Sequence, residues 1–107
     1  MIRYGSDEWN ELRFHAFYPK MEARGSLVDV ELEMELSALT PAPAGLTRLT
    51  AFIICTADGT IVEMTPRDEG CDCEFQFTAE EKAQLASYIS LPGVQEMIAK
   101  VSSQMDL

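Results

Sequence analysis

The longest unbroken alternation of apolar and polar residues runs from residue 28 to residue 36. Its even-numbered positions are apolar and its odd-numbered positions are acidic. Strict period two is typical of a half-buried strand, because successive side chains point to opposite faces of a sheet. We therefore expect a strand over 28–36 whose apolar side chains are buried and whose carboxylates are exposed. We call these carboxylates the acidic stripe: Asp29, Glu31, Glu33 and Glu35.

The segment before the stripe also alternates. Residues 11–18 place aromatic residues among their apolar positions, which favours a strand, although a helix capped at Ser6 fits the same residues. Pro19 is expected to end this strand, and Gly25-Ser26 to complete a long hairpin connection to the stripe. After the stripe, the two prolines of residues 40–45 predict a stiff, extended loop.

Three further strands are predicted in the second half of the chain. Residues 47–56 are apolar on both faces at their centre, as in a central strand covered on each side. Asp58-Gly59 suits a type I′ turn, which would join this strand to a second arm over 60–65 that stops at Pro66. A fifth strand is expected over 73–77, where phenylalanines and polar residues alternate.

The C-terminal part of the chain has helical patterns. Thr78-Ala-Glu-Glu81 is a capping box, and Pro92 suits the first position of a second helix that frays from Ser102 onward. The apolar stripes of the two helices are Leu85, Tyr88 and Ile89, and then Val94, Met97, Ile98 and Val101. The order of elements predicts one domain over 1–107 with an α+β fold: an antiparallel sheet of about five strands followed by two C-terminal helices packed on one face. The acidic stripe would then lie on the open face.

The net charge of the chain also indicates that this face binds a partner. The 107 residues carry 18 acids and 8 Lys or Arg, a formal net charge of −10, and the whole excess lies in residues 27–107. Such a field repels nucleic acid and anionic membranes and attracts basic proteins. A second acidic cluster supplies four more candidate partner-binding residues, Asp68, Glu69, Asp72 and Glu74, with Asp58 and Glu63 nearby.

The sequence offers little for catalysis. His15 is the only histidine, and neither glycine-rich phosphate-binding motif is present. Carboxylates that alternate on a solvent-facing strand keep ordinary acidity and suit recognition better than acid–base chemistry. We expect His15 to pair with a carboxylate, and we expect no enzyme activity and no cofactor.

The cysteines also argue against a metal or disulfide framework. Cys55, Cys71 and Cys73 are odd in number and include no C-x-x-C pair, which favours the reducing cytoplasm. A zinc site would need all three together with His15, in a spacing that fits no known finger or ribbon. Asp68-Glu69-Gly70 lacks the register of a calcium-binding loop. No apolar run approaches the ~20 residues of a membrane span, and the N-terminal residues lack the regions of a signal peptide.

These observations predict a non-enzymatic acidic binder that covers the basic, nucleic-acid-binding surface of a partner such as a nuclease. Neighbouring carboxylates on a strand face are roughly 6.6 Å apart, a scale similar to phosphate spacing. Immunity proteins against nuclease toxins and phage inhibitors of nucleases work on this principle. Trp9, Phe17 and Tyr18 are candidate anchors. The alternative is an adaptor, chaperone-like or assembly subunit that binds through a sheet edge or helix face, with the acids serving solubility and discouraging aggregation.

Overall fold

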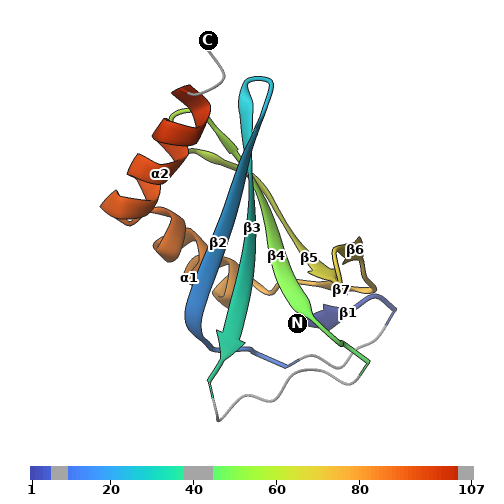
Figure 1. Cartoon of the computed structure of the whole chain (residues 1–107). Helices are drawn as coiled ribbons and strands as arrows, with labels where there is room; N and C mark the ends of the chain where they lie inside the picture. The colour runs from blue at the N-terminus through green and yellow to red at the C-terminus, as the bar shows by residue number, and fades with distance from the viewer. Residues whose placement is uncertain (6–9, 38–44, 104–107) are drawn as a thin grey trace.

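A five-stranded antiparallel sheet and two C-terminal helices make up most of the fold (Figure 1). The structure is a computed structural model that describes residues 1–5, 10–37 and 45–103. The sheet has the strand order β2-β3-β4-β5-β6, and β1 pairs with β7 in a separate two-stranded sheet. The elements are β1 (Ile2–Arg3), β2 (Phe14–Arg24), β3 (Leu27–Leu36), β4 (Leu49–Thr56), β5 (Ile61–Asp68), β6 (Cys71–Asp72), β7 (Phe75–Gln76), α1 (Ala79–Ile89) and α2 (Pro92–Ser103). The predicted α+β fold class is confirmed.

The core lies between the sheet and the helices. Val28, Val30 and Leu32 of β3 are fully buried, as the alternation predicted, and they share one apolar cluster with Leu85 of α1 and Ile98 of α2. Burying each such side chain stabilises the fold by roughly 1.5–3 kcal/mol relative to leaving it in water. The opposite face of the sheet carries the carboxylates of β3, and Phe52 and Ile54 of β4 lie on that face beside them.

Two prolines that were expected to end strands lie inside them. Pro19 lies within β2 opposite Leu32, and Pro66 lies within β5 opposite Ala51. A proline fits a strand where its missing N–H would have faced away from the ladder, as on an edge. β2 is an edge strand, and β6 pairs only with the last two residues of β5, so each proline has an unpaired side of its strand next to it.

The turns also differ in detail from the predictions. Gly25-Ser26 is a tight two-residue connection and not part of a long one, because Arg24 pairs with Leu27. The hairpin around Asp58-Gly59 is present, but of its residues only Gly59 has positive φ, so the turn is not type I′. Both residues of the Glu69-Gly70 turn have positive φ, at 52° and 80°, and this turn joins β5 to β6.

The predicted fifth strand over 73–77 is only partly correct. The fifth strand of the sheet is Cys71–Asp72, whereas Phe75–Gln76 leaves that sheet and pairs with Ile2–Arg3. The alternating phenylalanines correctly predicted which side chains are buried, since Phe75 and Phe77 are both buried. The pattern could not predict which strand they would pair with.

The helices begin where the sequence predicted. Thr78 caps α1 in a capping box with Glu81, and α2 starts at Pro92. Val94 and Ile98 are buried, but Met97 is 41% exposed, so its assignment to the buried stripe was wrong. The expected fraying from Ser102 was also wrong at its start, because α2 continues to Ser103. The remainder of that segment, Trp9, Ser6 and most of the loop over 40–45 lie outside the described residues.

Glu81 connects the first residues of the chain to α1. Its side chain is completely buried and accepts hydrogen bonds from the amino group of Met1, from Leu12 N at 2.8 Å and from Thr78 N at 2.9 Å. The carboxylate therefore caps its own helix and also binds two groups that lie some seventy and eighty positions earlier in the chain.

Candidate protein-binding face

The acidic stripe lies on the face of the sheet opposite the core, as predicted. Its exposure is lower than expected: Glu35 is exposed, whereas the side chains of Asp29 and Glu33 are only 20% and 46% exposed. Residues directly opposite each other in an antiparallel sheet share a face, so side chains of β2 and β4 flank the carboxylates. These neighbours remove part of the stripe from water.

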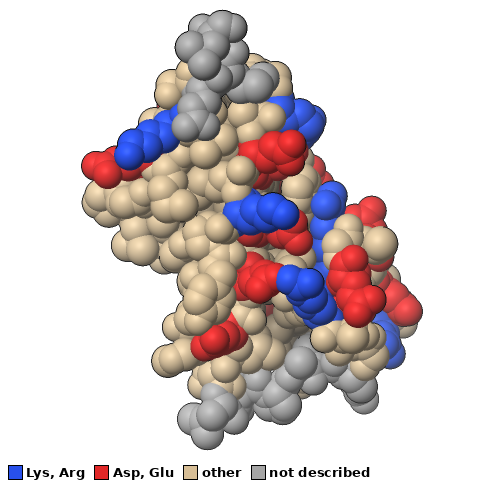
Figure 2. Space-filling view, viewed as in Figure 1, with Lys and Arg blue, Asp and Glu red and all other residues tan. Residues whose placement is uncertain are grey.

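Three members of the stripe have partners on the same face. Arg24 donates to both oxygens of Asp29 at 2.7 and 3.0 Å, and hydrogen bonding to Asp29 raises the pKa of Arg24. The Tyr18 hydroxyl donates to Glu35 at 2.8 Å, which raises the pKa of Tyr18. The stripe is thus a mixed row of charges, as the alternating red and blue atoms of Figure 2 show.

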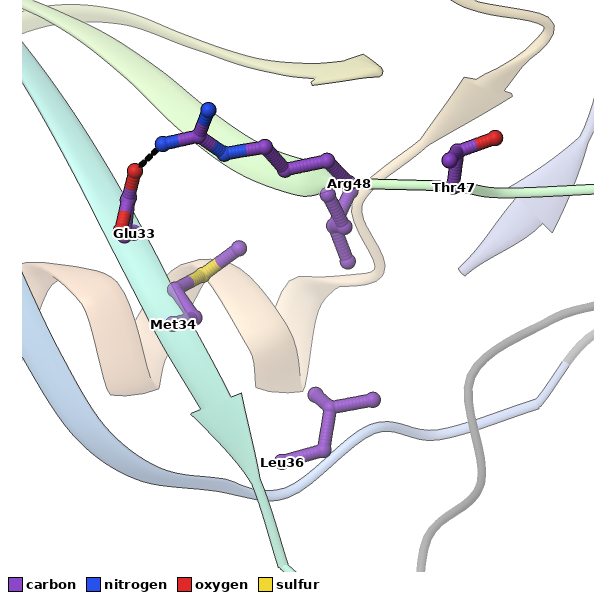
Figure 3. Close-up of a pocket in the computed structure, with 6 residues that line it drawn as sticks. Glu33, Met34, Leu36, Thr47 and Arg48 are labelled. Carbon is purple, nitrogen blue, oxygen red and sulfur yellow. Dashed lines mark ion pairs between the residues drawn. The ribbon is translucent and has the colours of Figure 1, made fainter. Parts of the chain in front are cut away.

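Glu33 is paired by Arg48, which precedes β4. Figure 3 shows Arg48 reaching across to Glu33, with Met34 and Leu36 beside them in a hollow of about 280 Å³. This pairing depends on the register of β3 against β4, which the local pattern around the stripe does not contain.

Glu31 is different, because it takes part in no ion pair in the described chain even though Lys20 lies opposite it in β2. It lines a hollow of about 210 Å³ together with Arg48, Thr50, Glu69 and Gly70. Glu69 is exposed and is also without an ion pair among the described residues. The structure therefore brings one member of the stripe and one member of the second acidic cluster to the same hollow.

Thr50 adds a second polar feature to this hollow. The residue is only 1% exposed, and its hydroxyl has no hydrogen-bond partner among the described atoms. A buried hydroxyl without a partner is unusual in a folded protein. The hollow thus joins two unpaired carboxylates with one unsatisfied hydroxyl.

The other members of the second cluster divide between structural and exposed positions. Asp68 accepts from the backbone N–H groups of Thr47 and Arg48 at 3.0 and 2.7 Å, so it fixes the entry to β4. Asp72 and Glu74 are 86% and 74% exposed, and each lies 3.8 Å from an arginine, Arg67 and Arg3 respectively. Acidic atoms are conspicuous in Figure 2 on the side where Figure 1 places β6 and β7.

A third hollow, of about 450 Å³, lies next to this cluster on the same face. Arg67 stacks over the Phe52 ring there, with its guanidinium carbon 3.7 Å from the ring centroid. Tyr4, which is 64% exposed, lines the same hollow. Tyr4 is thus a candidate anchor that the sequence analysis missed, because its position beside β4 and β5 arises from the pairing of β1 with β7.

The anchors proposed from sequence have mixed outcomes. Tyr18 is 52% exposed and lies on the open face. Phe17 instead packs on the core side against Tyr88, with ring centroids 4.6 Å apart, so it is not available to a partner on the stripe. Trp9 lies outside the described residues.

His15 and the acidic side chains considered for metal binding do not form a metal-binding group in the described part of the chain. His15 is exposed at the bulge of β2 and has no ion pair or hydrogen bond within the described chain, so the expected carboxylate partner was wrong. Across residues 1–5, 10–37 and 45–103, no group of three or more His, Cys, Asp or Glu side chains is arranged to hold a metal ion. None of the helices in these ranges is long and apolar enough to cross a membrane.

The three cysteines are free and differ in exposure, which predicts an order of reactivity. Cys71 is exposed, Cys73 is half-buried, and burial raises the pKa of the Cys55 thiol. We expect iodoacetamide to alkylate Cys71 first, Cys73 more slowly, and Cys55 only after unfolding, because the thiolate is the reactive form and must be accessible. Peptide mass spectrometry with and without denaturant measures this order. Alkylation of native Cys55 as fast as Cys71 would contradict the position of β4 in the core.

Fold and site together define a small α+β protein with a charged open sheet face. The chain matches no protein-family model, no curated protein and no solved structure.

Proposed function

We propose that this chain is a non-enzymatic acidic module that binds a basic protein in the cytoplasm and covers its nucleic-acid-binding surface, as immunity proteins and phage-encoded or mobile-element-encoded nuclease inhibitors do. The observation that carries the proposal is the hollow shared by Glu31 and Glu69. These two carboxylates come from separate acidic groups of the sequence, and both are without ion pairs in the described chain. A lysine or arginine of a partner would find two free acceptors there.

The surroundings of the hollow support the same function. The net charge of −10 attracts a basic surface over distance, whereas a few anchoring side chains supply most of the affinity. Tyr4 and Tyr18 are exposed aromatic residues that can serve as anchors. Asp29, Glu33 and Glu35 already have partners, so their contribution is the long-range field and the exposed oxygens that remain.

Charge reversal at the hollow tests this function. We expect the double variant Glu31→Lys with Glu69→Lys to lose capture of basic proteins from a lysate, and to associate at least about tenfold more slowly with a purified captured partner. Glu33→Lys is a poorer choice, because it would place a cation against Arg48. The matched control is Glu80→Lys with Glu96→Lys, which makes the same charge change at exposed positions on the helices.

Two further measurements separate inhibition from simple adhesion. The captured partner should bind nucleic acid when free and lose that binding in a stoichiometric complex with this protein. Association should also slow as salt rises, since screening shortens the field to roughly 8 Å at physiological ionic strength. If the face variant captures the same proteins at the same rate as the control, the acidic-binder function is wrong and the adaptor alternative takes its place.

A further inference from the structure

The outer edge of β2 is the longest unpaired edge in the described sheet. β2 spans eleven residues and stands at one end of the strand order, with β3 as its only described neighbour (Figure 1). An unpaired edge offers a row of backbone N–H and C=O groups to another strand.

The identity of the outward-facing residues follows from the hairpin and from Pro19. Arg24 and Leu27 close a two-residue turn, and in such hairpins the closing pair exchanges its hydrogen bonds within the hairpin. Bonded and non-bonded positions alternate from there, so odd-numbered residues of β2 point their backbone groups outward. Pro19 agrees with this parity, because a proline fits only where no donor is needed by the neighbouring strand. Met21 and Ala23 therefore offer both N–H and C=O to the outside.

The charged side chains on either side of Met21 can pair with the same side chains of a second copy of the chain. Lys20 and Glu22 lie on the open face, both are exposed, and neither forms an ion pair or side-chain hydrogen bond in the described chain. If a second β2 strand is paired antiparallel with its two-fold axis at Met21, Lys20 of each copy lies opposite Glu22 of the other. Opposite charges directly across a strand pair stabilise it, whereas like charges destabilise it.

The other positions of the same register also fit. The two Met21 residues exchange their N–H and C=O groups, and Ala23 N–H donates to the Pro19 C=O of the other copy. Only the donor that Pro19 lacks is missing. A two-fold axis at Pro19 would instead place two residues without N–H opposite each other and lose the central bonds. On the helix side, Pro19 would lie against the small side chain of Ala23.

We infer that two copies of this chain associate through antiparallel pairing of their β2 edges, centred on Met21, to form one continuous sheet. The two-fold axis runs perpendicular to the sheet, so both open faces lie on the same side and both helix layers lie on the other. The proposal goes beyond the proposed function, which concerns a different protein bound to the open face. It would present the Glu31–Glu69 hollow twice on one surface.

Sedimentation analysis over a concentration series, with paired charge variants, tests this inference. We expect a monomer–dimer equilibrium for the unmodified chain. Lys20→Glu and Glu22→Lys should each weaken the dimer by about tenfold or more, because symmetry turns two attractive contacts into two repulsive ones. The double variant Lys20→Glu with Glu22→Lys should restore dimerisation. Lys82→Glu and Glu96→Lys are controls with the same changes of net charge on the helices, and circular dichroism checks that every variant folds.

Amide hydrogen exchange provides a separate test of the register. The N–H groups of Met21 and Ala23 should become protected as the protein concentration rises, because they donate only across the dimer. A protein that stays monomeric at its highest soluble concentration would overturn the inference and would mean that the edge is occluded or too weak. The inference would also be overturned if neither single charge reversal weakened the dimer, or if the double variant failed to restore it. The same holds if the dimer left the N–H groups of Met21 and Ala23 unprotected. None of these outcomes depends on the capture of a basic partner.

Discussion

Replacement of Glu81 with alanine is expected to reduce the free energy of unfolding by about 3–5 kcal/mol, the range for breaking a buried ion pair by removing one partner. Glu81 is 0% exposed, and its carboxylate accepts from the Met1 amino group and from Leu12 N and Thr78 N. The variant leaves a buried ammonium and two backbone donors without these acceptors. The Met1 amino group keeps its hydrogen bond to the Asn10 carbonyl oxygen but loses its counter-charge, and the two backbone donors lose their hydration on folding and recover nothing in exchange.

Denaturant unfolding of three variants measures this effect and separates its parts. Glu80 is the exposed neighbour in the same helical turn, so Glu80→Ala should change stability by about 0.5 kcal/mol or less. Glu81→Gln keeps a hydrogen-bond acceptor and loses the charge, and it should fall between the other two. Equal stability of Glu81→Ala and Glu80→Ala would show that the carboxylate does not connect the N-terminal residues to α1.

The sequence predicted half of the role of Glu81. The capping box is a local motif, since Thr78 and Glu81 are three residues apart, and both of its hydrogen bonds are present. The contacts to Met1 and Leu12 are not local, and they need the whole sheet to bring the N-terminal segment beside α1. A glutamate in a capping box is expected to be exposed in the first turn of its helix, and nothing nearby in the sequence indicates that Glu81 is buried.

The difference between local and non-local contacts also explains which strands were predicted well. Residues 28–36 carry their signal in their own alternation, and the strand was found with nearly correct ends. Pro19 and Pro66 were read as strand ends because a proline usually forbids pairing. Whether it does so depends on which side of the strand is paired, and that is a property of the sheet as a whole.

The candidate site shows the limit most clearly. The stripe was found from local sequence, but its partial neutralisation by Arg24 and Arg48 depends on the turn at Gly25-Ser26 and on the pairing of β3 with β4. The meeting of Glu31 with Glu69 likewise requires the fold. Composition correctly indicated that acids exceed bases, but only the fold could show which of the acids remain unpaired.

Helix α2 offers the second test with a large expected effect, because two consecutive residues differ sharply in burial. Ile98 is fully buried in the core cluster, whereas Met97 is 41% exposed. Ile98→Ala should cost about 2–5 kcal/mol, since it removes buried methyl groups and leaves a cavity that the packed core closes only in part. Met97→Ala should cost about 1 kcal/mol or less, because water already reaches much of that side chain.

The two variants together measure the rotation of α2 about its own axis, on which the structure differs from the predicted stripe. Val94, Met97, Ile98 and Val101 are all compatible with one apolar stripe at helical spacing. The structure turns α2 so that Val94 and Ile98 face the core, and Met97 lies at the margin. Denaturant midpoints of the two variants decide between these orientations. Comparable losses for Met97→Ala and Ile98→Ala would mean that α2 lies on the sheet with the wider stripe buried, as the sequence pattern alone had predicted.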